Sequence, residues 1–315
     1  MSGIPNAENG FARPMPPSRR PGIGGGAGIL LLALLSARRA SAQAPAAPQN
    51  PVRSPGNADW ASTVDEASAR AAAEGKFLFI EFDSRDCGGC QRMDRLLYPA
   101  FDFEALLIPM VPVKVSIESG EGEELARRHG IKQTPAVLIK SPEGRMVVLM
   151  EGFTTAQDFY SNIRKEMDAY RAFARKAEAQ DISRLSASEA LETGRELYQR
   201  GDSASALPRL KRAVAAPGST VARRDEAREL LAAAQLDAGD IAASRQTINH
   251  LIETTKDSGR RERAELFRAQ IPLAENKPQE AYALYKKFEK DHPDSRYLPQ
   301  VRALAERLAA EKSKS

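Results

Sequence analysis

The chain has 315 residues, 42% of them hydrophobic and 28% charged, and its formal net charge is +4 at pH 7. The first 42 residues hold five arginines and one glutamate, so they account for the whole excess and the rest of the chain is neutral. The charge therefore gives no argument for binding nucleic acid, and we expect none. The three histidines are isolated and only two cysteines are present, which argues against a metal site.

Residues 1–42 have the pattern of a targeting segment. Three arginines precede an apolar stretch over residues 22–35, and Ala40-Ser41-Ala42 offers a small-x-small cleavage site. The apolar stretch is too short and too rich in glycine to prefer spanning a bilayer, which takes about 20 residues. We expect a cleavable signal peptide and a periplasmic or otherwise exported protein, with an uncleaved membrane anchor as the alternative. Ser18-Arg19-Arg20 weakly resembles a twin-arginine signal, so the export route stays open.

The rest of the chain divides into a linker and two domains. Residues 43–57 are rich in proline and offer too little apolar surface to fold, so we expect a linker there. We assign residues 58–179 to a first domain and residues 180–315 to a second, because the composition changes near residue 180. The first domain is expected to begin with a helix over 59–75, with Trp60 packing on its apolar face rather than contacting substrate.

The two cysteines follow a buried strand and open a helix. A continuous apolar run over residues 77–82, interrupted only by Glu81, predicts a central strand covered on both faces. Residues 91–97 show helical spacing, which places Cys87 at or just before a helix start and Cys90 one turn inside it. Backbone N–H groups and the helix dipole stabilise a thiolate at such a position. Cys87 is therefore the expected nucleophile and Cys90 the expected resolving thiol.

Two cysteines separated by two residues can close a small disulfide ring and open it again by thiol exchange. A structural disulfide is one alternative, but so short a ring constrains the unfolded chain little and therefore stabilises the fold weakly. A metal site is another alternative, and it would need two further ligands. We therefore expect a redox-active disulfide, with no other cofactor and no metal.

Further strands and helices are expected beyond the cysteines. Residues 111–117 predict a strand, and residues 122–129 predict a short helix. The segments 136–140 and 146–150 predict a hairpin. A helix over residues 155–170 is expected to close the domain.

Three separated features together resemble the thioredoxin-like superfamily over about residues 59–175. They are the buried strand, the Cys-x-x-Cys pair at a helix start, and the later segment 130–139 with Thr134-Pro135. The resemblance implies an α/β domain with a central mixed sheet and helices on both faces. It also implies that Pro135 is a cis-proline lying against the disulfide, and that the backbone of Thr134 pairs with the bound substrate.

The same resemblance implies roles for the residues around the cysteines. Glu81 takes the place of a buried acid that moves the proton of the resolving thiol, although an acid in a strand can also simply face solvent. Gly88 and Gly89, between the cysteines, are expected to form part of the substrate-binding loop.

Two positions depart from the pattern of better-known thioredoxins. Asp86 stands where tryptophan usually precedes the first cysteine, and Gly88-Gly89 replaces the usual Gly-Pro or Pro-His. A carboxylate beside Cys87 opposes the thiolate and favours the disulfide over the dithiol. We therefore expect reduction or isomerisation of substrates rather than oxidation, although nearby basic residues leave the direction of electron flow open.

Residues 180–315 predict an all-α domain with an internal repeat. Small residues stand at Gly194, Ala232 and Ala269, each followed twelve positions later by another, and the turns between them are spaced 38 and 37 residues apart. The pattern resembles tetratricopeptide repeats, whose usual period is about 34 residues. Stacked helix pairs offer a surface for a partner protein, so we expect a docking arm, with a stabilising or dimerising appendage as the alternative.

These features together predict an exported thiol-disulfide oxidoreductase that reduces or isomerises disulfides of extracytoplasmic proteins through Cys87 and Cys90. Its expected partners are disulfide- or thiol-bearing exported proteins, a redox partner protein, and a protein bound by the repeats. The alternative is a non-catalytic scaffold in which the repeats bind a partner and the first domain is structural. Copper handling is disfavoured because no further histidine or methionine ligands stand near the cysteine pair.

Overall fold

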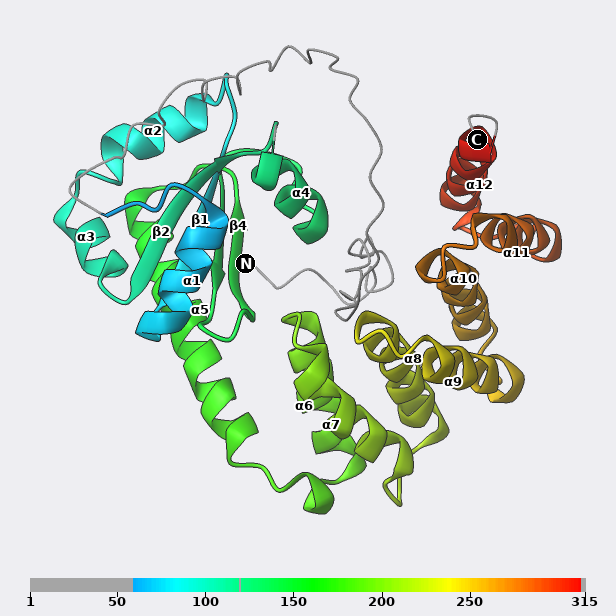
Figure 1. Cartoon of the computed structure of the whole chain (residues 1–315). Helices are drawn as coiled ribbons and strands as arrows, with labels where there is room; N and C mark the ends of the chain where they lie inside the picture. Colours follow the sequence, from blue (N-terminus) through cyan, green and yellow to red (C-terminus); the bar gives the residue numbers. More distant parts are fainter. Residues whose placement is uncertain (1–58, 119, 313–315) are drawn as a thin grey trace, which may run out of the picture.

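The computed structural model describes residues 59–118 and 120–312 (Figure 1). The chain has an N-terminal part built on a β-sheet and a C-terminal part built from helices alone. The predicted signal peptide, residues 1–42, and the predicted linker, residues 43–57, lie outside the described residues. None of the helices within the described ranges is long and apolar enough to cross a membrane.

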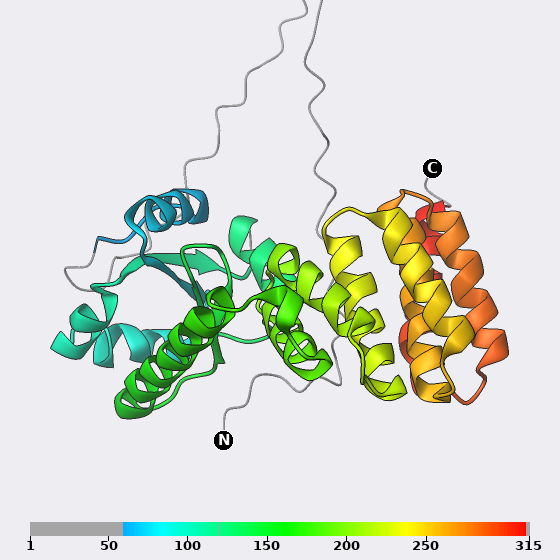
Figure 2. The same ribbon diagram turned by 90° about the horizontal axis from the view of Figure 1, so that it is seen from below.

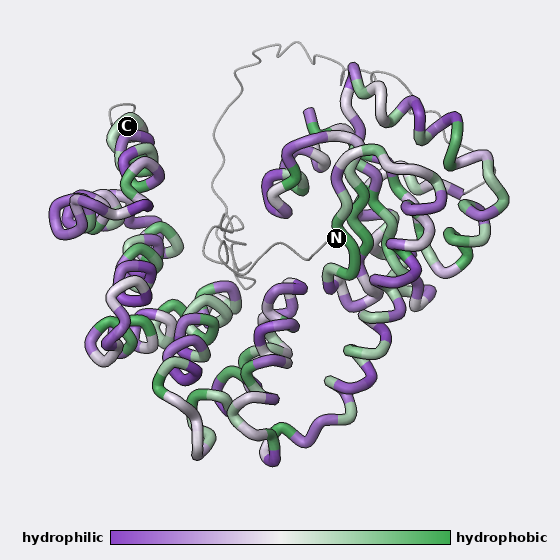
Figure 3. Tube along the Cα trace, turned by 180° about the vertical axis from the view of Figure 1, so that it is seen from behind, coloured by the Kyte–Doolittle hydropathy of each residue, from purple (hydrophilic) through white to green (hydrophobic). Residues whose placement is uncertain are grey.

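Four strands form one mixed sheet in the order β2-β1-β3-β4. The central strand β1 (Phe77–Asp83) runs parallel to β2 (Met110–Ser116) and antiparallel to β3 (Ala136–Lys140), and β4 (Met146–Glu151) pairs antiparallel with β3. β1 is buried from Leu78 to Phe82, as its continuous apolar sequence predicts. Figure 3 shows hydrophobic residues concentrated in these strands. The predicted α/β fold with a central mixed sheet is confirmed.

Helices cover both faces of the sheet. α1 (Val64–Glu74) and α4 (Gly120–His129) pack on one face, while α2 (Gly88–Leu96), α3 (Phe101–Leu107) and α5 (Ala156–Glu178) pack on the other. The sequence had given no sign of α3. Successive side chains of β1 point to alternate faces. The side chains at positions 79, 81 and 83 therefore all point toward the layer of α2 and α3, which decides the surroundings of the cysteines.

The first helix begins later than the sequence predicted. Ala61 forms a parallel bridge with Val113 of β2, and its N–H donates to the carbonyl of Pro112 at 2.9 Å. The segment around Ala61 is therefore extended. The helix α1 begins only after Thr63, whose hydroxyl caps its first turn. Trp60 precedes the helix and packs against aromatic rings, with its centroid 5.7 Å from that of Tyr98. The predicted packing role of Trp60 is confirmed, but not its place on a helix.

After a short 3-10 helix (Ile182–Arg184), the described residues of the C-terminal part form three helix pairs and a final helix (Figure 2). The pairs and the last helix are α6 (Ala187–Gln199) with α7 (Ser203–Ala215), α8 (Val221–Asp237) with α9 (Ile241–Thr254), α10 (Ser258–Ala274) with α11 (Pro278–Asp291), and α12 (Leu298–Lys312). In Figure 1, α6, α8 and α10 lie on the inner side of the arc and α7, α9 and α11 on its outer side. The predicted all-α repeat domain is confirmed.

Small residues let the paired helices approach closely. A Cβ on Gly194 would lie 2.9 Å from two side-chain carbons of Leu210 on the facing helix. In the second pair, the hydroxyl of Ser244 donates to the carbonyl of Ala232 at 2.7 Å. Ala269 is buried in the third pair. These are the positions that the repeat pattern singled out, and they lie where backbones meet.

The two parts of the chain are joined at the end of the sheet away from the cysteines. Arg200, in the turn between α6 and α7, forms two hydrogen bonds with Met146, each 2.8 Å long. The N–H of Met146 donates to the carbonyl of Arg200, and the guanidinium of Arg200 donates to the carbonyl of Met146. Arg145 donates to Asp202 at 2.7 Å. Lys140 pairs both with Met146 and with Leu78 at the start of β1. The junction is therefore remote from Asp83, the last residue of β1.

We expect Arg200→Ala to loosen this junction and to cost about 2 kcal/mol, because the carbonyl of Met146 loses the charged donor that the buried Arg200 supplies. Arg200 also lies over the ring of Tyr170, with its guanidinium carbon 5.3 Å from the centroid. Trp60 is the only tryptophan, so its fluorescence reports the sheet domain, while circular dichroism reports mainly the helices. Urea unfolding should show coincident transitions in the wild type and separated ones in the variant. Arg184→Ala, at an exposed arginine, is the control; equal behaviour of the two variants would refute this role of Arg200.

Candidate functional site

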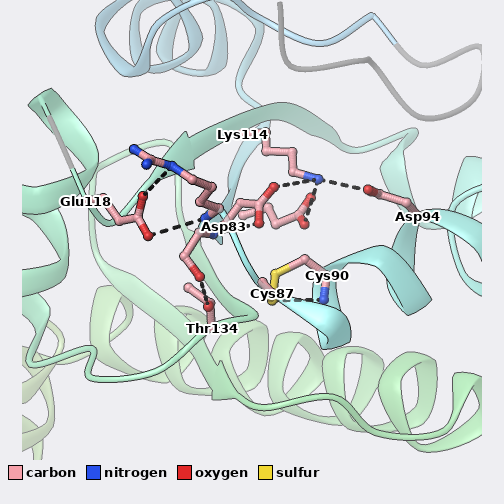
Figure 4. The surroundings of a disulfide bond; sticks show 10 residues. Asp83, Cys87, Cys90, Asp94, Lys114, Glu118 and Thr134 are labelled. Carbon is pink, nitrogen blue, oxygen red and sulfur yellow. Dashed lines mark hydrogen bonds and ion pairs between the residues drawn. A yellow bond between two sulfur atoms is a disulfide. The ribbon is translucent and has the colours of Figure 1, made fainter. Parts of the chain in front are cut away.

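The two cysteines form a disulfide at the start of α2 (Figure 4). Cys87 is the N-cap of the helix, and the backbone N–H of Cys90 donates to its Sγ at 2.9 Å. Cys87 is 7% exposed and Cys90 2% exposed. The more exposed of the two residues therefore stands at the helix terminus, where a thiolate is best stabilised. The placement predicted from helical spacing is confirmed.

The loop before β3 lies against this disulfide. The peptide bond between Thr134 and Pro135 is cis, as the resemblance implied. The hydroxyl of Thr134 hydrogen-bonds that of Ser84 at 2.6 Å, which ties the loop to the segment leading into the cysteines. A Cβ on Gly89 would lie 2.6 Å from Cδ of Pro135, so the proline ring and the cysteine loop are in close contact. The roles of Thr134, Gly88 and Gly89 in binding substrate stay predictions.

Alanine at the two glycines is expected to have different effects. Gly89→Ala must displace Pro135 or the start of α2, and we expect a loss of about 1–3 kcal/mol in stability together with slower thiol exchange. Gly88→Ala is the matched control for stability, because beyond its chain neighbours and the backbone of its own helix no atom lies within 4 Å of the added Cβ. Urea unfolding and the rate of insulin reduction check both variants. Equal effects at the two positions would contradict the close contact with Pro135.

Glu81 is fully buried within β1, the strand that leads to the cysteines. Its Oε1 lies 3.2 Å from Nζ of Lys114, an ion pair in which both side chains are almost inaccessible to water. Neither carboxylate oxygen has a well-formed hydrogen bond with the described residues. Burial raises the pKa of Glu81 to about 7, and the positive charge of Lys114 opposes that rise. A carboxyl with this pKa can accept or release a proton near neutral pH.

Lys114 joins three carboxylates, and the sequence interpretation did not include it. Its Nζ lies 3.4 Å from Asp83 and 2.9 Å from Asp94, in addition to the contact with Glu81. Burial favours the neutral amine, but the three acids outweigh it and hold the pKa of Lys114 above its ordinary value. The register of the parallel pair sets Lys114 directly beside Glu81. The one signal in the sequence was a lysine within an apolar strand.

Asp83, rather than Asp86, forms a compact group with the two sulfurs. A carboxylate oxygen of Asp83 and the Sγ atoms of Cys87 and Cys90 all lie within 4.8 Å of one another. Asp86 precedes Cys87 in the chain, but its side chain is exposed and is not part of this group. The effect of Asp86 on the thiolate stays a prediction, and Asp83 is a second carboxylate that the sequence analysis did not consider. Alternation along β1 points the side chain of Asp83 to the face where α2 begins.

The fold and the Cys-x-x-Cys disulfide beside a cis-proline define a thioredoxin-like domain. Residues 64–166 match the family described as a thioredoxin-like domain, which confirms the resemblance seen in the sequence. The thiol:disulfide interchange protein DsbD of Ralstonia nicotianae is 26% identical over 114 residues, which cover 35% of this chain and 19% of that protein. This chain thus matches about a fifth of the length of its curated relative.

Solved structures are similar to about a third of the chain. A thioredoxin from Thermus thermophilus is 29% identical, and the match covers 32% of this chain and 82% of that one, with a TM-score of 0.31. The reduced C-terminal domain of Neisseria meningitidis DsbD is 18% identical, and the match covers 33% of this chain and 93% of that one, with a TM-score of 0.30.

Proposed function

We propose that the protein is an exported thiol-disulfide oxidoreductase that reduces or isomerises disulfides of extracytoplasmic proteins. The observation that carries the proposal is the Cys87–Cys90 disulfide at a helix start, with Pro135 against the loop between the cysteines and Glu81 buried in the strand that leads to them. A structural disulfide needs neither a buried acid titrating near pH 7 nor a cis-proline beside it. The relationship to a thiol:disulfide interchange protein supports the same chemistry.

The reaction follows from these positions. The thiolate of Cys87 attacks one sulfur of a substrate disulfide; a Cys87–substrate bond forms, and the other substrate sulfur leaves as a thiolate. The carboxylate of Glu81 takes the proton of Cys90, whose thiolate attacks Cys87 and releases the second substrate sulfur. The substrate gains two electrons and the cysteine pair loses two. A dithiol of a redox partner protein returns the electrons to Cys87 and Cys90.

Trapping of mixed disulfides tests this function. The full chain carrying Cys90→Ser should retain exported proteins covalently on Cys87, and dithiothreitol should release them. The matched variant Cys87→Ser should retain none, because the attacking sulfur is missing. If neither variant traps a protein and the wild type does not catalyse insulin reduction, the oxidoreductase is refuted and the scaffold built on the helical repeats takes its place.

Export and docking are parts of the same proposal. The pattern of residues 1–42 supports export through a cleaved signal peptide, which N-terminal sequencing of the protein from a periplasmic fraction tests. A protein that retains residue 1 in the cytoplasmic fraction would refute export. The helical pairs support a partner-binding arm, because stacked pairs offer an extended surface and their junction at Met146 lies at the opposite end of the sheet from the disulfide.

A further inference from the structure

Asp83 is held in place beside the disulfide (Figure 4). One carboxylate oxygen accepts a hydrogen bond from the N–H of Ser84 at 2.6 Å, and the other lies 3.4 Å from Nζ of Lys114. Its side chain is 29% exposed, so it is neither buried like Glu81 nor free in solvent. Because one oxygen lies within 4.8 Å of both sulfurs, a thiolate formed on Cys87 faces this carboxylate.

The charges around Asp83 leave this repulsion largely uncompensated. Glu81 approaches from β1, Lys114 from β2, and Asp94 from α2. The single positive charge of Lys114 is shared among three acids, so it does not cancel the charge of Asp83 at the sulfurs. The cation in the following loop, Arg85, is exposed and pairs with Glu118 at 3.9 Å. A negative charge so close to a thiolate raises the free energy of the reduced pair and leaves the uncharged disulfide unaffected.

We propose that the carboxylate of Asp83 shifts the equilibrium of the Cys87–Cys90 pair toward the disulfide and so makes the protein a stronger reductant. This inference rests on the proposed function and gives it a direction of electron flow. Asp83 acts through its field on the sulfurs and takes no part in bond making. In the exchange the cysteine pair gives two electrons to a substrate disulfide, and the negative charge of Asp83 favours that transfer because it destabilises the electron-rich thiolate.

The test compares isosteric variants of the full chain in glutathione redox buffers from pH 6 to pH 9. Asp83→Asn keeps the oxygen that accepts from Ser84 but removes the charge. Above the pKa of Cys87, we expect the equilibrium constant for reduction of this variant to be about tenfold larger than that of the wild type. This corresponds to a reduction potential about 30 mV higher. The difference should vanish at lower pH, where Cys87 is a neutral thiol in both proteins. The pH dependence of alkylation by iodoacetamide should show the pKa of Cys87 lowered by about one unit.

Two variants separate the field of Asp83 from other effects. Asp86→Asn removes a charge next to Cys87 in the chain, but at an exposed position. Asp94→Asn frees Lys114 from one partner, as Asp83→Asn does, without removing the charge beside the sulfurs. Both should shift the equilibrium by less than threefold. Asp83→Ser provides a second uncharged residue should the asparagine variant fold poorly.

The proposal is overturned if Asp83→Asn equals the wild type, if Asp86→Asn or Asp94→Asn has the same effect, or if the shift is constant across the pH range. A constant shift would indicate a structural change instead of a charge effect. These measurements use the protein's own two cysteines. Failure to cycle at all in the wild type would refute the proposed function, whereas normal cycling without a specific effect of Asp83 would refute this inference alone.

Discussion

Replacing Glu81 with glutamine should slow the resolving step about 100-fold at pH 8, because Cys90 then lacks the base that takes its proton. The attack of Cys87 on the substrate should be little changed, since Glu81 acts on the second step. In the wild type the resolving rate should rise with pH through about 7, the pKa to which burial raises Glu81. Below that pH the wild-type carboxyl is also protonated, so the two proteins should converge. Rapid-mixing measurements of substrate thiol release resolve the two steps.

Glu118→Gln is the control for this prediction. Glu118 lies at the same end of the sheet, but its side chain is exposed and pairs with Arg85. This variant should follow the wild-type rate at every pH. A Glu81→Gln protein that keeps the wild-type rate and inflection would show that another group, or water, takes the proton of Cys90.

The same substitution should stabilise the oxidised protein at alkaline pH. The pKa of Glu81 is raised from its ordinary 4.5 to about 7 in the folded state, so folding favours the protonated acid. The stability that this group contributes is complete below pH 4.5 and is lost as the pH rises through 7. Above that pH the charged acid costs about 3 kcal/mol, at 1.36 kcal/mol for each pKa unit. Glutamine mimics the protonated acid and avoids this cost.

Urea unfolding of the oxidised full chain, followed by the fluorescence of Trp60, measures this effect. The stabilities of wild type and Glu81→Gln should be equal near pH 4 and should diverge as the pH rises to 8, with the variant more stable. Asp102→Asn, at an exposed acid of α3, should show no such divergence. A variant that is less stable than the wild type at pH 8 would mean that the ion pair with Lys114 outweighs the cost of burial.

The parts of the site that lie in one short segment could be predicted from the sequence. The strand before Cys87, the helix after it and the spacing of Cys90 are local features, and the structure places all of them as expected. The cis peptide bond before Pro135 followed from the resemblance. Local signals sufficed here because the nucleophile, the resolving thiol and the helix terminus lie within one turn.

The charges around the disulfide could not be predicted because they depend on pairing between distant segments. Lys114 meets Glu81 through the register of two parallel strands, which the sequence does not specify. Asp86 was chosen for its place next to Cys87 in the chain, yet a strand end turns Asp83 toward the sulfurs and leaves Asp86 in solvent. Adjacency in sequence was a poor guide to distance in this loop.

In the helical part, too, local patterns could be predicted from the sequence and contacts between distant segments could not. Gly194 and Ser244 were recognised by spacing, since close packing of paired helices demands small residues at fixed intervals. The contact of Arg200 with Met146 joins two domains, and no periodic pattern announces such a contact. The burial of Arg200 is explained by its hydrogen bond to the carbonyl of Met146, a residue far from it in the sequence.

The contacts of Ala61 with β2 and of Arg200 with β4 also affect how readily two molecules associate. β2 and β4 are the edges of the sheet, and edge strands with free backbone groups invite pairing with another chain. Ala61 covers part of the β2 edge through its bridge with Val113. The turn at Arg200 covers the start of the β4 edge at Met146. The segment before α1 and the helical domain thus cover part of each edge and reduce the backbone that is open to edge-to-edge pairing.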